Sequence, residues 1–161
     1  MNVAPRTALA AILFLGAASP ALAEGPPDFC AGLKELIAAG ATSFESVKSE
    51  PSPMGDRWKL ASGLPGAGEC VITKPKDGAK LSCTMAWDSD RAVIDPKYAD
   101  VKKKVESCLA GWTATDDASP LDPMATVFTG GDAGVRVGVR LTNAGTAFNL
   151  SVSLKAKPAS K

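Results

Sequence analysis

The sequence predicts an α+β fold in which two helices pack on one face of a largely antiparallel β-sheet. Two segments place apolar residues at the three- and four-residue spacing of amphipathic helices. Most of the remaining chain alternates apolar and polar residues, as half-buried strands do. Eight such strands could also form a β-sandwich. The apolar stripe of the second helix disfavours that alternative, because the stripe needs a sheet face to cover and a closed sandwich offers none.

Each of the two helices has recognisable ends. The first is expected over residues 28–39, where Asp28 can cap the start and Gly40 stands where a C-terminal glycine belongs. The second is expected to begin with Asp95 as the N-cap and Pro96 at the first helical position. Its apolar stripe consists of Ile94, Tyr98, Val101, Val105, Cys108 and Leu109. Each helix therefore has one face to bury.

The strands are predicted from alternation with a period of two. Clear alternation covers residues 57–60, 81–87, 135–141 and 148–154, and weaker patterns cover 42–48, 70–74, 112–116 and 125–129. Hairpin turns are expected at 76–78 and 143–145. The phase of the pattern places Trp58, Trp87 and Trp112 on inward faces, so we interpret them as core residues rather than as an aromatic platform.

The order helix, four strands, helix, four strands predicts a tandem duplication within one domain, with repeats over residues 28–90 and 91–157. A constant offset aligns Cys70 with Val137 and Cys83 with Leu150, so that core positions match core positions. The alternative is that any two units of this kind share glycines, prolines and alternation. The order of elements is the same under either interpretation.

The cysteines Cys30, Cys70, Cys83 and Cys108 all lie on predicted apolar faces. No two of them have the close spacing of a zinc knuckle, so two disulfides are expected. A hairpin turning at 76–77 places Cys70 directly opposite Cys83, within bridging distance. Cys30 is then left to pair with Cys108.

Residues 1–23 read as a cleaved secretory signal peptide. Arg6 precedes an apolar stretch, and Ala21-Leu22-Ala23 is a small-x-small cleavage site. The alternative, an N-terminal anchor, is disfavoured because the stretch is shorter than the ~20 residues of a membrane span. We therefore expect a periplasmic or extracellular protein, which fits the predicted disulfides.

Composition excludes several functions. The chain has no histidine, so it cannot hold a Ser-His-Asp triad or a histidine-ligated metal. The formal net charge is +1 without a long basic run, which predicts no nucleic-acid partner and no membrane partner after cleavage. No cofactor or metal is expected. Asp88 and Asp90 are the best acid/base or cation candidates, but we interpret them as a loop before the second helix.

Two loops, 49–55 and 119–124, are stiffened by prolines and carry a methionine that nothing obvious buries. Stiff loops lose little entropy on docking, and methionine adapts to varied surfaces. The candidate partner-binding residues are Pro53, Met54, Leu121 and Met124. The alternative is that both loops pack on their own domain.

These observations predict a small secreted or periplasmic binding protein without catalytic residues, such as an inhibitor or adaptor of another protein or an unidentified ligand. An envelope structural or assembly protein is the alternative, and a carboxylate-dependent hydrolase using Asp88 and Asp90 is the weaker one. Tandem helix-plus-four-strand units joined by disulfides are similar in layout to secreted β-lactamase inhibitory proteins. No sequence motif is shared, so the similarity implies no site residue.

Overall fold

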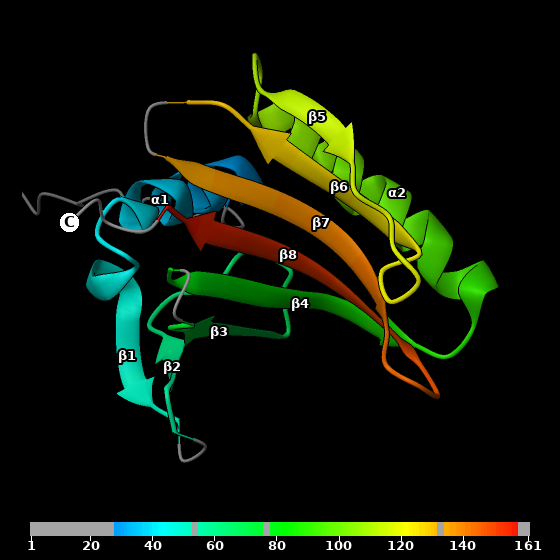
Figure 1. Cartoon of the computed structure of the whole chain (residues 1–161), viewed down its shortest axis with the longest axis horizontal. Helices are drawn as coiled ribbons and strands as arrows, with labels where there is room; N and C mark the ends of the chain where they lie inside the picture. The colour runs from blue at the N-terminus through cyan, green and yellow to red at the C-terminus, as the bar shows by residue number, and fades with distance from the viewer. Residues whose placement is uncertain (1–27, 53–54, 76–77, 132–133, 158–161) are drawn as a thin grey trace, which may run out of the picture.

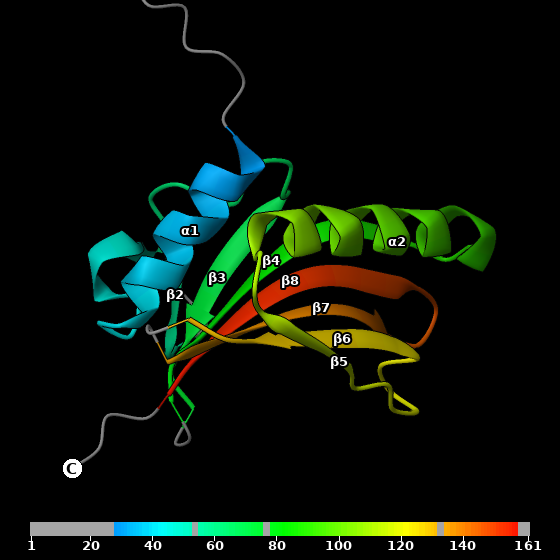
Figure 2. The same cartoon turned by 90° about the horizontal axis from the view of Figure 1, so that it is seen from above.

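The computed structural model of the protein describes residues 28–52, 55–75, 78–131 and 134–157. In this part of the chain, two helices lie on one side of an eight-stranded antiparallel sheet (Figures 1 and 2). No helix of the described ranges covers the opposite face of the sheet, which curves inward (Figure 2), and we call it the concave face. The fold class is therefore the α+β arrangement that the sequence predicts.

Each half of the chain supplies one helix and a four-stranded meander. The first half contains α1 (Phe29–Gly40), the 3-10 turn η1 (Glu45–Val47), β1 (Lys48–Pro51), β2 (Arg57–Leu60), β3 (Glu69–Thr73) and β4 (Lys80–Asp88). The second half contains α2 (Arg91–Cys108), β5 (Thr113–Asp116), β6 (Met124–Thr129), β7 (Val135–Asn143) and β8 (Phe148–Ala156). The strand order is β1-β2-β3-β4-β8-β7-β6-β5, so β4 and β8 join the two meanders. The tandem duplication is compatible with this order and stays a prediction.

The core lies between the helices and the sheet. Alternate residues of the central strands are buried beneath the helices, among them Leu81, Val137 and Val152. Their sequence neighbours point to the concave face because successive strand residues face opposite sides. One polar pair lies within this layer, where the hydroxyls of Tyr98 and Thr126 are 2.9 Å apart.

The strand expected over 42–48 is not formed. Ser43 and Phe44 have positive φ angles of 54° and 63°, η1 follows directly, and β1 begins only at Lys48. The left-handed turn brings Phe44 back beneath α1, where its side chain is fully buried. Burial of this ring outweighs the local β pattern, because a large aromatic side chain removes much apolar surface from water.

Gly40 is the last residue of α1 rather than a left-handed residue after it. The reason is space, since a Cβ added at Gly40 would lie 2.4 Å from Cγ2 of Val135 on β7. The C-terminal end of α1 can therefore approach the sheet closely only if this residue has no side chain.

The second helix begins earlier than predicted, at Arg91. Asp90 is the N-cap, and its side chain accepts a hydrogen bond from the Ala92 amide at 2.8 Å. Pro96 lies within the helix, and Asp95 forms an ion pair with Arg91 one turn earlier. Two capping signals compete here. The earlier one prevails because it lets the helix add another turn that buries Ile94.

Trp87 lies on the concave face with 56% of its surface exposed, so the core interpretation of this residue is wrong. The pairing of β4 with β8 shifts register between Thr84 and Ala86. Such a bulge adds one residue to β4, so the side chains that follow it in the strand point to the opposite side of the sheet from the one that simple alternation predicts. Trp58 and Trp112, in contrast, are half-buried against the core.

The structure joins Cys30 to Cys108 and Cys70 to Cys83, the same two pairs that the sequence predicts. Cys70 and Cys83 are direct cross-strand partners in the β3–β4 pair. The other bridge links the first turn of α1 to the last residue of α2. Two disulfides are compatible with an oxidising, exported location. The predicted signal peptide, residues 1–23, lies outside the described residues.

Candidate functional site

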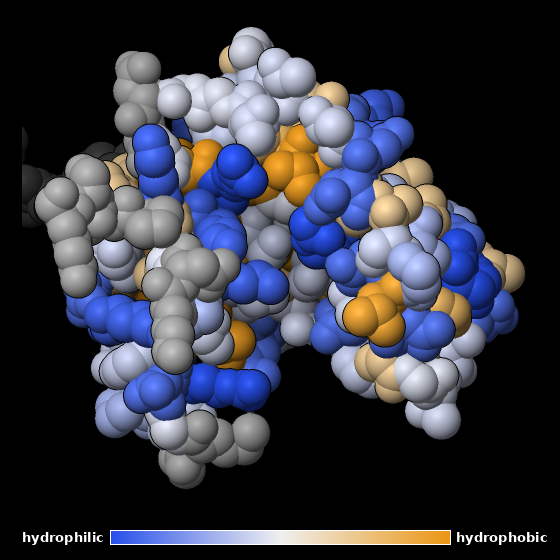
Figure 3. Space-filling model, viewed as in Figure 1, coloured by the Kyte–Doolittle hydropathy of each residue, from blue (hydrophilic) through white to orange (hydrophobic). Residues whose placement is uncertain are grey.

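The concave face contains a hollow of about 910 Å³. It is lined by outward-facing residues of β4, β6, β7 and β8 and by the connection between β5 and β6. Figure 3 views this face directly and shows mainly hydrophilic residues gathered around the central depression. The hollow lies opposite the helices, so a ligand could enter it without any movement of the core.

Cross-strand register arranges the concave face in rows that run across the sheet. At one end, Lys80 of β4 is paired with Lys155 of β8, which is paired with Arg136 of β7. All three side chains are exposed, and all three line the hollow. We call these three residues the basic row.

The next row forms the floor of the hollow and consists of small residues. Ser82, Ser153 and Gly138 are neighbours on β4, β8 and β7. A Cβ added at Gly138 would lie 3.0 Å from Oγ of Ser153. Because the side chains in this row are small, they do not fill the hollow between the charged residues on either side of it.

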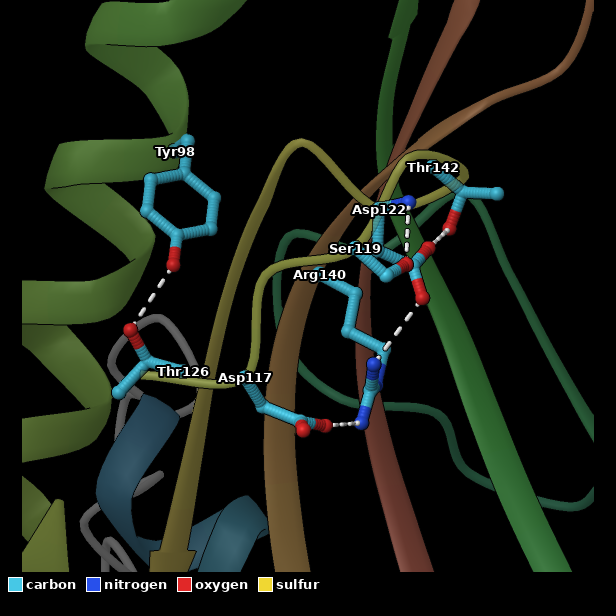
Figure 4. Close-up of polar contacts among 7 residues, drawn as sticks. All are labelled: Tyr98, Asp117, Ser119, Asp122, Thr126, Arg140 and Thr142. Carbon is cyan, nitrogen blue, oxygen red and sulfur yellow. Dashed lines mark hydrogen bonds and ion pairs between the residues drawn. The ribbon is translucent and has the colours of Figure 1, made fainter. Parts of the chain in front are cut away.

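Arg140 of β7 is held above the floor by two carboxylates of the β5–β6 connection (Figure 4). Its Nη1 donates to Oδ2 of Asp122 at 3.0 Å, and its Nη2 donates to Oδ2 of Asp117 at 2.5 Å. Asp122 also accepts a hydrogen bond from the hydroxyl of Thr142 at 2.6 Å. These bonds fix the guanidinium and tie the connection to the sheet.

The ion pairs of Arg140 raise its pKa and occupy both carboxylates. Burial alone would lower the pKa of Arg140, but its hydrogen bonds with Asp117 and Asp122 outweigh that effect, and the pKa is raised. Arg140, like other arginines in proteins, is a permanent cation. Because each carboxylate pairs with that cation, neither is placed to act as a general acid.

The far end of the concave face combines an aromatic ring with an unsatisfied acceptor. Trp87 is paired with Asn149 of β8, which is paired with Thr142 of β7. Oδ1 of Asn149 is buried and has no hydrogen-bond partner in the described structure. A buried acceptor without a donor costs free energy, so this residue is a local cost to the fold at the end of the hollow.

The predicted partner-binding residues have different positions. Pro53 and Met54 lie outside the described residues. Leu121 lines the hollow and is 71% exposed. Met124 is not at a loop tip; it is the first residue of β6, half-buried against the core, with its sulfur 3.6 Å from Nη2 of Arg91. Of the predicted set, the structure places Leu121 at the hollow.

Most residues of the hollow are not predicted as site residues by the sequence. Alternation already places Arg136 and Arg140 on the outer face of their strand, and this was the available signal. Their neighbours come from β4 and β8, whose pairing with each other joins the two halves of the chain. No local pattern identifies those partners.

The carboxylates Asp88 and Asp90 have a local structural role. Oδ1 of Asp88 accepts from the amide of Asp90 at 3.0 Å, and Asp90 caps α2. Across the described ranges there is no group of three or more acidic or cysteine side chains that could hold a metal ion. The same residues contain no helix long and apolar enough to cross a membrane.

Together, the fold and the hollow define an α+β protein with helices on one side of an open, concave antiparallel sheet. Comparison with protein-family models, with curated proteins and with solved structures finds no match for this chain. The similarity in layout to β-lactamase inhibitory proteins thus gains no support from these comparisons. The functional argument depends on the surface itself.

Proposed function

We propose that this is a non-catalytic binding protein that uses the concave face of its sheet to bind another protein. The observation that carries the proposal is the composition of that face. A leucine and a fixed arginine line a polar hollow, and an exposed tryptophan lies on the same sheet face, paired with Asn149 of the hollow. Tryptophan and arginine are the residue types most enriched among the energetically dominant contacts of protein interfaces.

Trp87 supports the proposal because its exposure has an identifiable structural cause. Without the bulge in β4, the alternation would turn the ring into the core. Bulges often re-aim a side chain next to a functional site. Leu121, at the side of the hollow, is the other large apolar residue that the described part of the chain exposes on this face. A partner that covers both would remove their apolar surface from water.

The hydrolase alternative has less support. Asp88 and Asp90 serve the start of α2, and Asp117 and Asp122 bind Arg140. The chain also has no histidine to act as a base near neutral pH. The proposed setting is the periplasm or the extracellular space after cleavage of residues 1–23, where the two disulfides would persist.

Capture of a partner by immobilised protein tests the proposal. Wild type, Trp87→Ala, Leu121→Ala and Val93→Ala are each incubated with periplasmic extract and spent medium of the source organism, and captured proteins are identified by mass spectrometry. Val93 is the matched control, because it is 41% exposed on α2, on the side away from the concave face.

We expect wild type and Val93→Ala to capture the same protein and Trp87→Ala to capture at least about tenfold less, as loss of an interface hot spot does. All four proteins should have unfolding free energies within about 0.5 kcal/mol, since the altered side chains are exposed. Equal capture by Trp87→Ala and Leu121→Ala would refute the proposal. Failure of wild type to capture any protein would favour a structural role in the envelope.

A further inference from the structure

The sheet ends in two edge strands, β1 and β5, and they are built differently (Figures 1 and 2). β1 has features that prevent an edge strand from pairing with another chain: the charged residues Lys48 and Glu50, a proline at Pro51 and an irregular register with β2. β5 has no lysine and no proline, and its register with β6 is continuous from Thr113 to Asp116. All four β5 residues are exposed. The β5 edge is therefore the more open of the two to an added strand.

The hydrogen bonds of β5 decide which of its backbone groups are free. The amide of Asp117, the residue after the strand, donates to the carbonyl of Ala125 beside β6 at 2.9 Å. Because the N–H and C=O groups of successive residues in a strand point to opposite neighbours, every second residue of β5 before Asp117 also faces β6. Ala114 and Asp116 therefore point their N–H and C=O groups away from the sheet. Within the described ranges no other backbone group bonds to these two residues, so two donors and two acceptors are available to another strand.

The charges at the C-terminal end of β5 indicate what an added strand would carry. Three carboxylates lie there, those of Asp116, Asp117 and Asp122. In the ion pairs of the described residues they share two cations, Lys102 and Arg140, so one negative charge is in excess. The side chain of Asp116 is 82% exposed. A basic residue opposite Asp116 on a neighbouring strand would form a favourable cross-strand pair with it.

From this edge we infer that the protein bound on the concave face adds an extended segment to β5 as the next, antiparallel strand of the sheet, with a lysine or arginine opposite Asp116. The inference rests on the proposed function and specifies how the partner is held. An antiparallel segment exchanges both backbone hydrogen bonds with Ala114 and both with Asp116. Its residue between them lies beside Thr115, which lines the hollow, so the added strand would extend the concave face at its edge.

A second copy of this chain fits the β5 edge less well than a partner segment does. Pairing of β5 with itself would join two strands of only four residues, and a stable interface between copies buries at least ~1,200 Å². It would also bring Asp116 and Asp117 of both copies to one junction, to which β5 supplies no basic residue. A segment of a protein that is also held in the hollow needs only a few backbone bonds here and can supply the missing cation.

The test uses the full chain with both disulfides and a capped peptide, Ser-Thr-Lys-Thr-Val-Thr-Ser, whose lysine and valine would lie opposite Asp116 and Ala114. In the control peptide the amides of that lysine and valine are N-methylated and cannot donate. Ala114→Pro removes an outward N–H of β5, and an edge strand tolerates proline where that N–H bonds no other strand. Ala114→Ser keeps the N–H and is the matched control. Asp116→Asn removes the charge that the lysine would pair with.

We expect wild type to bind the peptide and to bind the N-methylated peptide about tenfold more weakly, because hydrogen bonds on both rungs are lost. Ala114→Pro should weaken binding to a similar extent, Asp116→Asn by about two- to fivefold, and Ala114→Ser by less than about twofold. In the free protein the amides of Ala114 and Asp116 should exchange rapidly with solvent, and the bound peptide should slow their exchange about tenfold. The comparison of the two peptides uses wild type alone, so it decides the matter even if Ala114→Pro fails to fold.

Several results would overturn the inference: no binding of the peptide at millimolar concentration, equal binding of the N-methylated peptide, or slow exchange of the Ala114 and Asp116 amides in the free protein. Dimerisation of wild type that Ala114→Pro abolishes would overturn it as well, because the strand added to β5 would then be a second copy.

Extract capture separates this inference from the proposed function. If Trp87→Ala abolishes capture and Ala114→Pro captures like wild type, the concave face binds a protein but the segment added to β5 is refuted. If Trp87→Ala and Leu121→Ala capture normally, the proposed function fails, even when the peptide binds β5. Loss of capture in both Trp87→Ala and Ala114→Pro, with normal capture by Ala114→Ser, would support both.

Discussion

The two disulfides should differ in what they contribute to stability, and the difference can be calculated from their positions. The Cys30–Cys108 bridge spans a sequence separation of 78 residues and ties α1 to α2. The Cys70–Cys83 bridge spans 13 residues within one hairpin. A cross-link restricts the unfolded chain more when it closes a longer loop. The perturbation is removal of each bridge in turn, as Cys30→Ala/Cys108→Ala and Cys70→Ala/Cys83→Ala.

The chain-entropy relation gives about 4.5 kcal/mol for the helix bridge and about 3 kcal/mol for the hairpin bridge. Alanine is used because it leaves no unpaired hydroxyl in the core at either bridge, so that the difference of about 1.5 kcal/mol reports mainly on loop length. With a urea dependence of about 2 kcal/mol per molar, the two variants should differ by about 0.75 M in midpoint.

Urea unfolding of the wild type and both variants, followed by circular dichroism and tryptophan fluorescence, measures the difference. The wild-type protein, unfolded with and without a reductant, provides the control for removal of both bridges. The reasoning would be refuted if Cys70→Ala/Cys83→Ala were destabilised as much as Cys30→Ala/Cys108→Ala, or more. In that case local strain or residual structure in the unfolded hairpin would outweigh loop length.

Three further predictions concern single side chains. Tyr98→Phe should cost about 1 kcal/mol of unfolding free energy in urea, because it removes a buried hydroxyl pair between α2 and β6. Gly40→Ala should destabilise by about 1–3 kcal/mol in thermal unfolding despite alanine's better helix propensity, because the added methyl group meets Val135. Hydrogen bonds led by that of Lys74 lower the pKa of Glu45, so its carboxylate stabilises the fold above about pH 4.3 and this contribution is lost as the pH falls through the lowered pKa. Wild type should have a higher melting temperature than Glu45→Gln at pH 7, and the two melting temperatures should converge in acid. If they do not converge, the assignment is contradicted.

Local patterns in the sequence were sufficient for the layers of this protein. Alternation assigns β7 and β8 their inward faces, and the apolar stripe of α2 requires a sheet to cover. The pairing of Cys70 with Cys83 follows from counting outward from one hairpin turn, since a short loop sets the register of its own strands. These properties depend on residues that are close in sequence, so they can be predicted without knowing which distant segments pack together.

Tertiary structure alone decided the candidate site. The basic row exists because β4 pairs with β8 in one particular register, and these strands come from opposite halves of the chain. The bulge that exposes Trp87 and the contacts of Arg140 with Asp117 and Asp122 likewise depend on partners distant in sequence or on the register of another strand. Register between distant strands is selected by packing of the whole core, and slipping by one residue would turn buried side chains to the solvent. That is why the sequence determined which face of each strand is polar, whereas only the folded sheet determined which polar residues meet there.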